Sequence, residues 1–179
     1  VLAIQETKVE DSLFPIHEIE EAGYHVAIHG QKSYNGVATI SRLPITNVRT
    51  GFDDPLFPND CRILTCTIED LEIINTYVPN GTKIGTDKFE YKLRWLERFR
   101  TMMLSMGSAP VVWLGDINIA PTPKDVYDSR RFYGGVGHHP EEFSRLRAIT
   151  DLGLTDCFRK FNQEPGFYSY YDYFIVNSV

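Results

Sequence analysis

Short apolar runs separated by polar turns dominate the chain, and only a few longer amphipathic segments lie between them. Runs of four to eight residues that are rich in Val, Ile, Thr and aromatic side chains predict β-strands. We expect strands at Val1–Ile4, Tyr24–His29, Val37–Ser41, Arg62–Ile68, Glu72–Val78, Val111–Leu114 and Phe174–Val176. No run repeats at a fixed period and no low-complexity linker divides the chain, so we expect one domain over residues 1–179.

Helical spacing of apolar residues appears in a few segments. A short amphipathic helix is predicted over Phe14–Glu21 and another over Pro140–Leu152. Asp87 with Glu90 three residues later resembles a capping box, which would begin a longer helix. The apolar stripe of that helix is broad, which is typical of packing against a sheet.

The connections between the strands limit the fold class. The short turn Glu69–Leu71 joins two strand-like runs and indicates antiparallel neighbours. Helices lie between other strands. The pattern therefore favours an α/β (α+β) protein with a mixed sheet, or two stacked sheets, and helices outside.

Composition excludes a membrane-spanning protein. Hydrophobic residues make up 42% of the chain and charged residues 23%, and no apolar segment approaches the roughly 20 residues that a spanning helix needs. The start, Val1–Ile4, is too short for a signal-peptide core and has no basic lead-in. We expect a cytoplasmic protein.

Cysteine, histidine and net charge exclude further classes. The three cysteines have no metal-ligand spacing and the histidines form no HExxH motif, so a zinc site is not expected. A net charge of −6 argues against indiscriminate nucleic-acid binding but allows a local basic face. Candidates for such a face are Lys8, Lys32, Arg62, Lys83, Lys88, Lys124, Arg130 and Arg131, although each could simply solvate the surface.

The most informative polar cluster is Gly115–Asn118, which directly follows the apolar run Val111–Leu114. Strand alternation would point the Asp116 carboxylate and the Asn118 amide to the same side, where such a pair can orient water and bind an anion. The alternative is an Asx-rich turn that leaves a strand.

Two further polar side chains stand at strand ends. Tyr77 lies near the end of Glu72–Val78, where its phenol can donate to a phosphate or to a leaving oxygen. Glu6 follows the first strand, and Mg²⁺ needs only one or two protein carboxylates because water and substrate phosphate complete its shell. The alternatives are a tyrosine that anchors a sheet edge and an exposed Glu6 paired with Lys8.

Taken in order, these motifs resemble exonuclease III, whose family contains the apurinic/apyrimidinic endonucleases of base excision repair. The resemblance extends over almost the entire chain. Its segments are Ile4–Lys8, His29–Lys32, Asn35–Ala38, Ile74–Gly81, Leu114–Thr122 and Asp151–Arg159. The resemblance implies two stacked mixed β-sheets flanked by helices, a four-layer sandwich that here lacks terminal strands.

The resemblance also implies roles for individual residues. It makes Glu6 the Mg²⁺ ligand, with Mn²⁺ as the alternative ion, and Tyr77 the phenol that contacts the scissile phosphate. Asp116 would position or deprotonate the attacking water, Asn118 would donate to a phosphoryl oxygen, and Arg62 would line the DNA side. The expected substrate is duplex DNA with abasic sites or 3′ ends, bound by a monomer.

The chain departs from the family's pattern in three places. The family begins with a strand that carries a metal-binding Asn, and it finishes with a Ser-Asp-His-Ala-Pro segment that supplies a metal-linked Asp and a catalytic His. Neither is found in residues 1–179, and an internal loop is missing near residues 172–174. Asp172 therefore matches either of two family aspartates, of which only the later is catalytic. We expect a domain that is incomplete at both ends and near 172–174.

Two other functions remain open. Related phosphodiesterases and phosphatases that act on phospholipids or inositol phosphates have a similar Glu and Asp-x-Asn core, but Gly30–Lys32 and Asn35–Ala38 favour the DNA-repair branch. The missing terminal motifs also allow a noncatalytic DNA-binding remnant.

Overall fold

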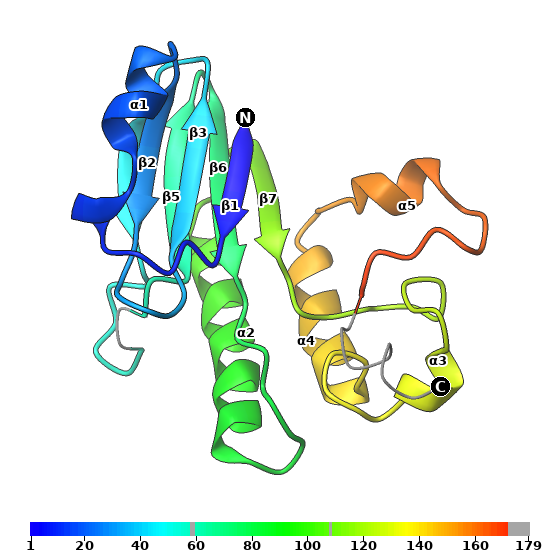
Figure 1. Cartoon of the computed structure of the whole chain (residues 1–179). Helices are drawn as coiled ribbons and strands as arrows, with labels where there is room; N and C mark the ends of the chain where they lie inside the picture. Colours follow the sequence, from blue (N-terminus) through cyan, green and yellow to red (C-terminus); the bar gives the residue numbers. More distant parts are fainter. Residues whose placement is uncertain (58–59, 108, 172–179) are drawn as a thin grey trace, which may run out of the picture. The chain divides into compact units, whose positions relative to one another are not determined.

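The computed structural model describes residues 1–57, 60–107 and 109–171. It divides into two compact units. Val1–Val78 and Ser105–Ile117 form the first unit, and Pro79–Leu104 with the chain from Asn118 onward forms the second. Figure 1 shows the strands of the first unit and the helices of the second.

The described strands of the first unit form two sheets (Figure 1). One sheet has the order β1 (Leu2–Gln5), β3 (Val37–Ser41) and β2 (His25–His29), with antiparallel pairing throughout. The other has the order β4 (Thr46–Thr50), β5 (Ile63–Ile68), β6 (Leu71–Tyr77) and β7 (Val111–Asp116), in which only the β6–β7 pair is parallel. A short 3-10 helix, η1 (Asp11–Leu13), and α1 (Ile16–Glu21) precede β2, and α1 contacts β2.

Apolar side chains from both sheets make the core of the first unit. Ala27 and Val37 from one sheet pack with Leu64, Cys66 and Ile73 from the other. The predicted stacking of two sheets is therefore confirmed. The predicted antiparallel pair is also confirmed, since β5 and β6 are joined by a two-residue turn.

Strand β4 was not predicted from the sequence. Every residue of Thr46–Thr50 is exposed, so the strand carries no apolar alternation, and backbone pairing with β5 holds it at the edge of its sheet. The predicted strand Phe174–Val176 lies outside the described residues.

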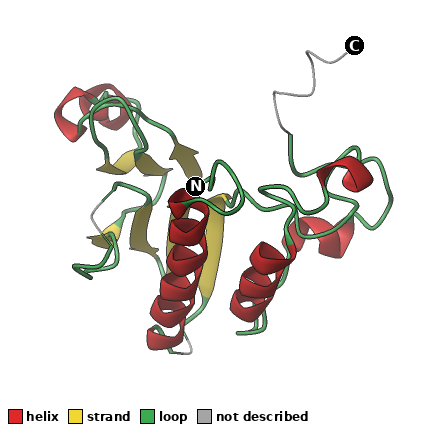
Figure 2. Cartoon of the chain, turned by 90° about the horizontal axis from the view of Figure 1, so that it is seen from below, coloured by secondary structure: helices red, strands yellow, loops and turns green. Residues whose placement is uncertain are grey.

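Helices make up most of the regular structure of the second unit (Figure 2). They are α2 (Asp87–Ser105, whose last residue belongs to the first unit), α3 (Ser129–Phe132), α4 (Pro140–Thr150) and α5 (Cys157–Phe161). The apolar stripe of α2 is buried, at Phe89, Leu93, Trp95, Leu96, Phe99 and Met103. No helix in the described ranges is both long and apolar enough to cross a membrane.

The prediction that Asp87 and Glu90 form a capping box at the start of α2 was wrong. The helix begins at Asp87 itself, and the Thr86 carbonyl accepts hydrogen bonds from the amides of Phe89 and Glu90. Asp87 and Glu90 are thus both acidic residues of the first turn, where they stabilise the positive end of the helix dipole. A capping box is instead present in α4, between His139 and Glu142.

The three cysteines are free thiols in the structure. Cys61 and Cys66 are buried and Cys157 is exposed. Burial raises the pKa of Cys66 to about 11, so this thiol stays protonated and unreactive at neutral pH.

The buried Asp125 carboxylate connects separate segments of the second unit. Asp125 accepts hydrogen bonds from the Thr122 amide and hydroxyl, from the Ser169 hydroxyl and from the Arg159 guanidinium. Burial alone would raise the pKa of Asp125, but the hydrogen bonds from Thr122, Ser169 and Arg159 outweigh it and lower the pKa. The ionised form therefore stabilises the folded state.

We expect Asp125→Asn to lower the free energy of unfolding by about 3 kcal/mol at pH 7, because it leaves the Arg159 charge without its carboxylate. Because the folded-state pKa is depressed, this stabilisation is present above the unfolded pKa near about 4 and is lost as the pH falls through the folded pKa. Urea unfolding at pH 7 and at pH 3 measures both effects. The control is Asp128→Asn, which keeps an N-cap acceptor for Arg131. A loss at pH 7 no larger than that of the control would contradict the prediction.

Candidate active site

The loop after β1 carries Glu6 in a fixed conformation. Glu6 and Lys8 both have φ of 55°, in the left-handed region, so the loop needs outside support. The Thr7 amide donates to the Gly36 carbonyl at 3.3 Å, and the Lys8 amide donates to the Asn35 carbonyl at 2.9 Å. A Cβ at Gly36 would come within 2.0 Å of the Thr7 hydroxyl oxygen, so only glycine permits this close approach.

The Glu6 carboxylate is ionised at neutral pH. Lys8 lies 2.8 Å from it and holds the pKa of Glu6 below its ordinary value against the opposing effect of burial, with smaller contributions from Tyr77 and Arg62. The alternative pairing of Glu6 with Lys8 is thus present in the structure. It does not exclude a functional role, because the same carboxylate also accepts a hydrogen bond from the Tyr77 hydroxyl.

Tyr77 is the last residue of β6 and lies under the guanidinium of Arg62. The Arg62 guanidinium carbon is 4.7 Å from the centre of the Tyr77 ring, a cation–π contact. Arg62 also donates from Nε to the Asp60 carboxylate at 2.8 Å and from Nη1 to the Tyr77 carbonyl at 3.2 Å. These contacts fix the phenol and the guanidinium relative to each other.

The Tyr77 hydroxyl keeps its proton at neutral pH. Burial raises the pKa of Tyr77 and the negative charge of Glu6 raises it further, while Arg62 opposes them and Asp116 adds the smallest of these contributions. In the structure the single phenol donor is used by Glu6, and an anionic substrate would receive it only in place of that carboxylate.

Asp116 ends β7 directly opposite Tyr77 in the parallel ladder. A Cβ at Gly115, where φ is 126°, would lie 2.0 Å from the Thr76 carbonyl oxygen, so glycine lets β7 approach β6 closely just before the aspartate. The Asp116 carbonyl then accepts the Val78 amide at 2.9 Å. The structure therefore brings Glu6, Arg62, Tyr77 and Asp116 together in the first unit.

Asn118 belongs to the second unit, where Asn80 donates from Nδ2 to its side-chain oxygen at 3.2 Å. Because β7 ends at Asp116 and Asn118 has a φ of 52°, strand alternation does not extend to Asn118. Strand alternation was therefore the wrong basis for placing the Asp116 and Asn118 side chains on the same side.

A buried asparagine that the prediction did not assign to the site supports its base. Asn75 has an exposed fraction of 0%, accepts from the Gln5 amide at 2.8 Å, and donates to the Ala38 carbonyl at 2.9 Å. It thus connects the residue before Glu6 with the strand that ends at Tyr77. The signal available in the sequence was an amide directly after the apolar pair Ile73 and Ile74 of a strand.

The oxygen donors of this cluster fit a hard divalent cation. In the described part of the chain, no group of three or more His, Cys, Asp or Glu side chains could hold a metal ion. Mg²⁺ does not need such a group, because one or two carboxylates suffice when water and phosphate fill the remaining positions. Glu6, ionised and 43% exposed, meets that requirement. Asp172, the remaining candidate, lies outside the described residues.

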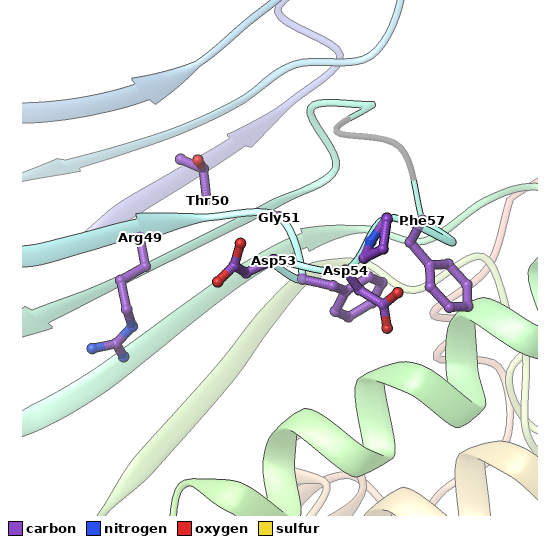
Figure 3. A pocket seen from close by; sticks show the side chains of 8 residues that line it. Arg49, Thr50, Gly51, Asp53, Asp54 and Phe57 are labelled. Carbon is purple, nitrogen blue, oxygen red and sulfur yellow. The ribbon is translucent and has the colours of Figure 1, made fainter.

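The hollow at the end of β4 is separate from these residues. Arg49, Asp53, Asp54 and Phe57 are among its lining residues (Figure 3), and none of the predicted site residues contributes to it. Arg49 is paired with Glu72 at 2.7 Å. The candidate active site is therefore the cluster at the ends of β1, β6 and β7.

Comparison with known proteins gives consistent results. The chain is 32% identical to exodeoxyribonuclease III of Haemophilus influenzae over 97% of its own length and 70% of that protein. It is 25% identical to a DNA-(apurinic or apyrimidinic site) endonuclease of Dictyostelium discoideum, of which it covers 49%. The chain thus spans 70% of the length of the first relative and about half of the length of the second.

Solved structures agree in fold. An AP endonuclease from Archaeoglobus fulgidus matches with a TM-score of 0.89 and 36% identity over 96% of this chain and 67% of that one. A 3′-5′ exonuclease from Neisseria meningitidis matches with a TM-score of 0.90 and 33% identity over 96% and 68%. The model of the Endonuclease/Exonuclease/phosphatase family matches residues 1–178, and the chain belongs to this family.

Proposed function

We propose that this protein is a Mg²⁺-dependent DNA phosphodiesterase of base excision repair, which cleaves 5′ to abasic sites and removes nucleotides from 3′ ends of duplex DNA. The observation that carries the proposal is the cluster of Glu6, Tyr77 and Asp116 at the ends of β1, β6 and β7 with Arg62 directly before β5. The relatives named exodeoxyribonuclease III and AP endonuclease support it, as does a similar Neisseria 3′ phosphatase solved with a product DNA hairpin. The family match over residues 1–178 supports one catalytic domain, which we propose acts as a monomer.

The residues divide the chemistry of phosphodiester hydrolysis between them. Asp116 accepts a proton from the attacking water, which adds to phosphorus as the bond to the leaving 3′ oxygen breaks. The protonated Tyr77 phenol donates to a phosphoryl oxygen, and the Arg62 guanidinium balances the negative charge of the DNA backbone. Asn118, two residues after Asp116, donates from its amide to another phosphoryl oxygen.

Glu6 is the residue that would hold the metal ion. A bound Mg²⁺ would neutralise charge on the phosphoryl oxygens. Mg²⁺ is the ion we propose, and Mn²⁺ is the alternative. The low pKa of Glu6 keeps the carboxylate ionised throughout the neutral range, as a ligand requires.

A substrate panel tests the function directly. The protein encoded by the complete gene is incubated with a 5′-labelled abasic duplex, a recessed 3′-end duplex and an inositol phosphate, each with Mg²⁺ or with EDTA. We expect incision of the abasic duplex and shortening of the 3′ end in Mg²⁺ and neither in EDTA. Hydrolysis of the inositol phosphate alone would assign the protein to the alternative branch, and binding of duplex without cleavage would make it a noncatalytic DNA-binding protein.

A further inference from the structure

A fully buried ion pair joins α2 and α4 in the second unit. Lys92 and Glu142 both have an exposed fraction of 0%, and the ammonium and the carboxylate are in direct contact. Removing two charges from water is so unfavourable that an apolar pair of similar size is often at least as stable at such a position. Stability alone therefore does not explain why a buried ion pair stands at this position.

Every donor of the Lys92 ammonium has an identified acceptor. Besides Glu142, Nζ donates to the Asn118 carbonyl at 2.7 Å and to the Asn80 carbonyl at 3.1 Å. Glu142 in turn accepts the amides of Gly137 and His139, each at 3.1 Å. The pair thus fixes the main chain at two asparagines that are 38 residues apart in sequence.

The side chains of the same two asparagines are bonded in one defined orientation. The Thr82 amide donates to Oδ1 of Asn80 at 3.0 Å, so Nδ2 is the atom of Asn80 that points to Asn118. This Nδ2 donates to Oδ1 of Asn118 at 3.2 Å. Since Oδ1 of Asn118 is used as the acceptor, Nδ2 of Asn118 is the group that serves as a donor.

The Lys92 ammonium also contacts the Asn118 backbone. The φ of Asn118 is 52°, in the left-handed region that asparagine adopts more readily than most residues, and Lys92 donates to the Asn118 carbonyl in that conformation. A Cβ at Gly81 would lie 3.1 Å from Cδ of Lys92, so a glycine beside Asn80 leaves room for the lysine side chain.

We propose that Lys92, held by Glu142, is a positioning residue that sets the Asn118 amide as a hydrogen-bond donor to the phosphoryl oxygen. Asn80 binds Oδ1 of Asn118 and thereby directs Nδ2 of Asn118 to the substrate. The proposal rests on the proposed function for its catalytic consequence, but the geometry it describes lies within the second unit and can be tested without catalysis.

The kinetic test uses Lys92→Met/Glu142→Gln, which removes the charges and keeps similar volumes. We expect kcat to fall about tenfold with unchanged KM and unchanged Mg²⁺ half-saturation, because a transition-state contact is lost. Asn118→Ala is the second arm of a double-mutant cycle. The triple variant should be no slower than Asn118→Ala within about twofold, since both changes remove the same contact. Losses that multiply in the triple variant would overturn the proposal.

The matched control is another ion pair between the same helices. Arg145 of α4 lies 2.9 Å from Glu97 of α2, and the hydrogen bonds of both side chains go to neither Asn80 nor Asn118. Glu97→Gln/Arg145→Met should leave kcat within about twofold of the wild type. A loss equal to that of K92M/E142Q would mean that helix packing, and not positioning, explains the effect.

A readout without catalysis separates this proposal from the function. In ¹⁵N-labelled protein, the Asn118 side-chain amide signal, assigned by its disappearance in Asn118→Ala, should shift in K92M/E142Q and stay in place in E97Q/R145M. If the wild type cuts no DNA, the proposed function fails while this spectrum still decides the positioning role. An unmoved Asn118 signal would overturn it.

A second variant is available if K92M/E142Q does not fold. Asn80→Asp is an exposed substitution that replaces the donor facing Asn118 by an acceptor. We expect it to turn the Asn118 amide around, to shift the same signal and to lower kcat at least as much as K92M/E142Q. If the Asn118 signal of Asn80→Asp stays at its wild-type position, Asn80 does not set the orientation of the Asn118 amide.

Discussion

We expect Asp116→Asn to lower kcat for abasic-site cleavage by at least about 100-fold, because it removes the proposed general base while keeping the shape of the side chain. Asp116 stands opposite Tyr77 in the β6–β7 ladder, and its negative charge contributes to the raised pKa of the Tyr77 phenol. The substitution therefore also removes one of the charges that keep the phenol protonated. The carbonyl of residue 116 still accepts the Val78 amide, so the strand itself is unaffected.

Single-turnover cleavage of an abasic duplex at saturating Mg²⁺ measures this effect without product release. Asp70→Asn is the control, because Asp70 lies in the turn between β5 and β6 and takes no part in the cluster. It should cleave at the wild-type rate. Wild-type cleavage by Asp116→Asn would remove Asp116 from the catalytic residues.

Strand alternation was sufficient to predict most of the first unit. Strand β3 was predicted with its observed bounds, and β6 within one residue, because each carries a short apolar run with turn residues on both sides. The same alternation located Tyr77, whose position at a strand end is set by local sequence. Strand β4 could not be found this way, since an exposed edge strand is defined by the partner that it pairs with.

The site could be predicted only where a residue's role follows from its own segment. Glu6 and Tyr77 are at strand ends, but their hydrogen bond depends on how two sheets stack, which no local pattern specifies. Asn118 was identified by its motif, whereas its partners Asn80 and Lys92 come from other segments of the second unit. Lys92 had one available signal, since it stands three residues after Phe89 on the buried stripe of α2, where a charged side chain needs a partner.

The second large effect concerns the metal. Glu6→Gln replaces an ionised carboxylate by a neutral amide, which is a much weaker ligand for a hard cation. We expect the Mg²⁺ half-saturation to rise at least about tenfold and kcat/KM at about 1 mM Mg²⁺ to fall about 100-fold, since charge neutralisation by the ion supplies several kcal/mol. Stability should change little, because the Glu6–Lys8 pair that is lost is about half exposed.

The ion pair with Lys8 provides the control that isolates this role. Lys8→Met breaks the same 2.8 Å contact but keeps the carboxylate, and it removes a positive charge from beside the proposed ligand. Titration of free Mn²⁺ by electron paramagnetic resonance measures binding directly, with no need for turnover. Glu6→Gln should weaken Mn²⁺ binding, whereas Lys8→Met should leave it unchanged or tighter, because the competing ammonium is gone. If both variants weaken binding equally, Glu6 acts through Lys8 and the loop that they stabilise, and the ligand must be another group.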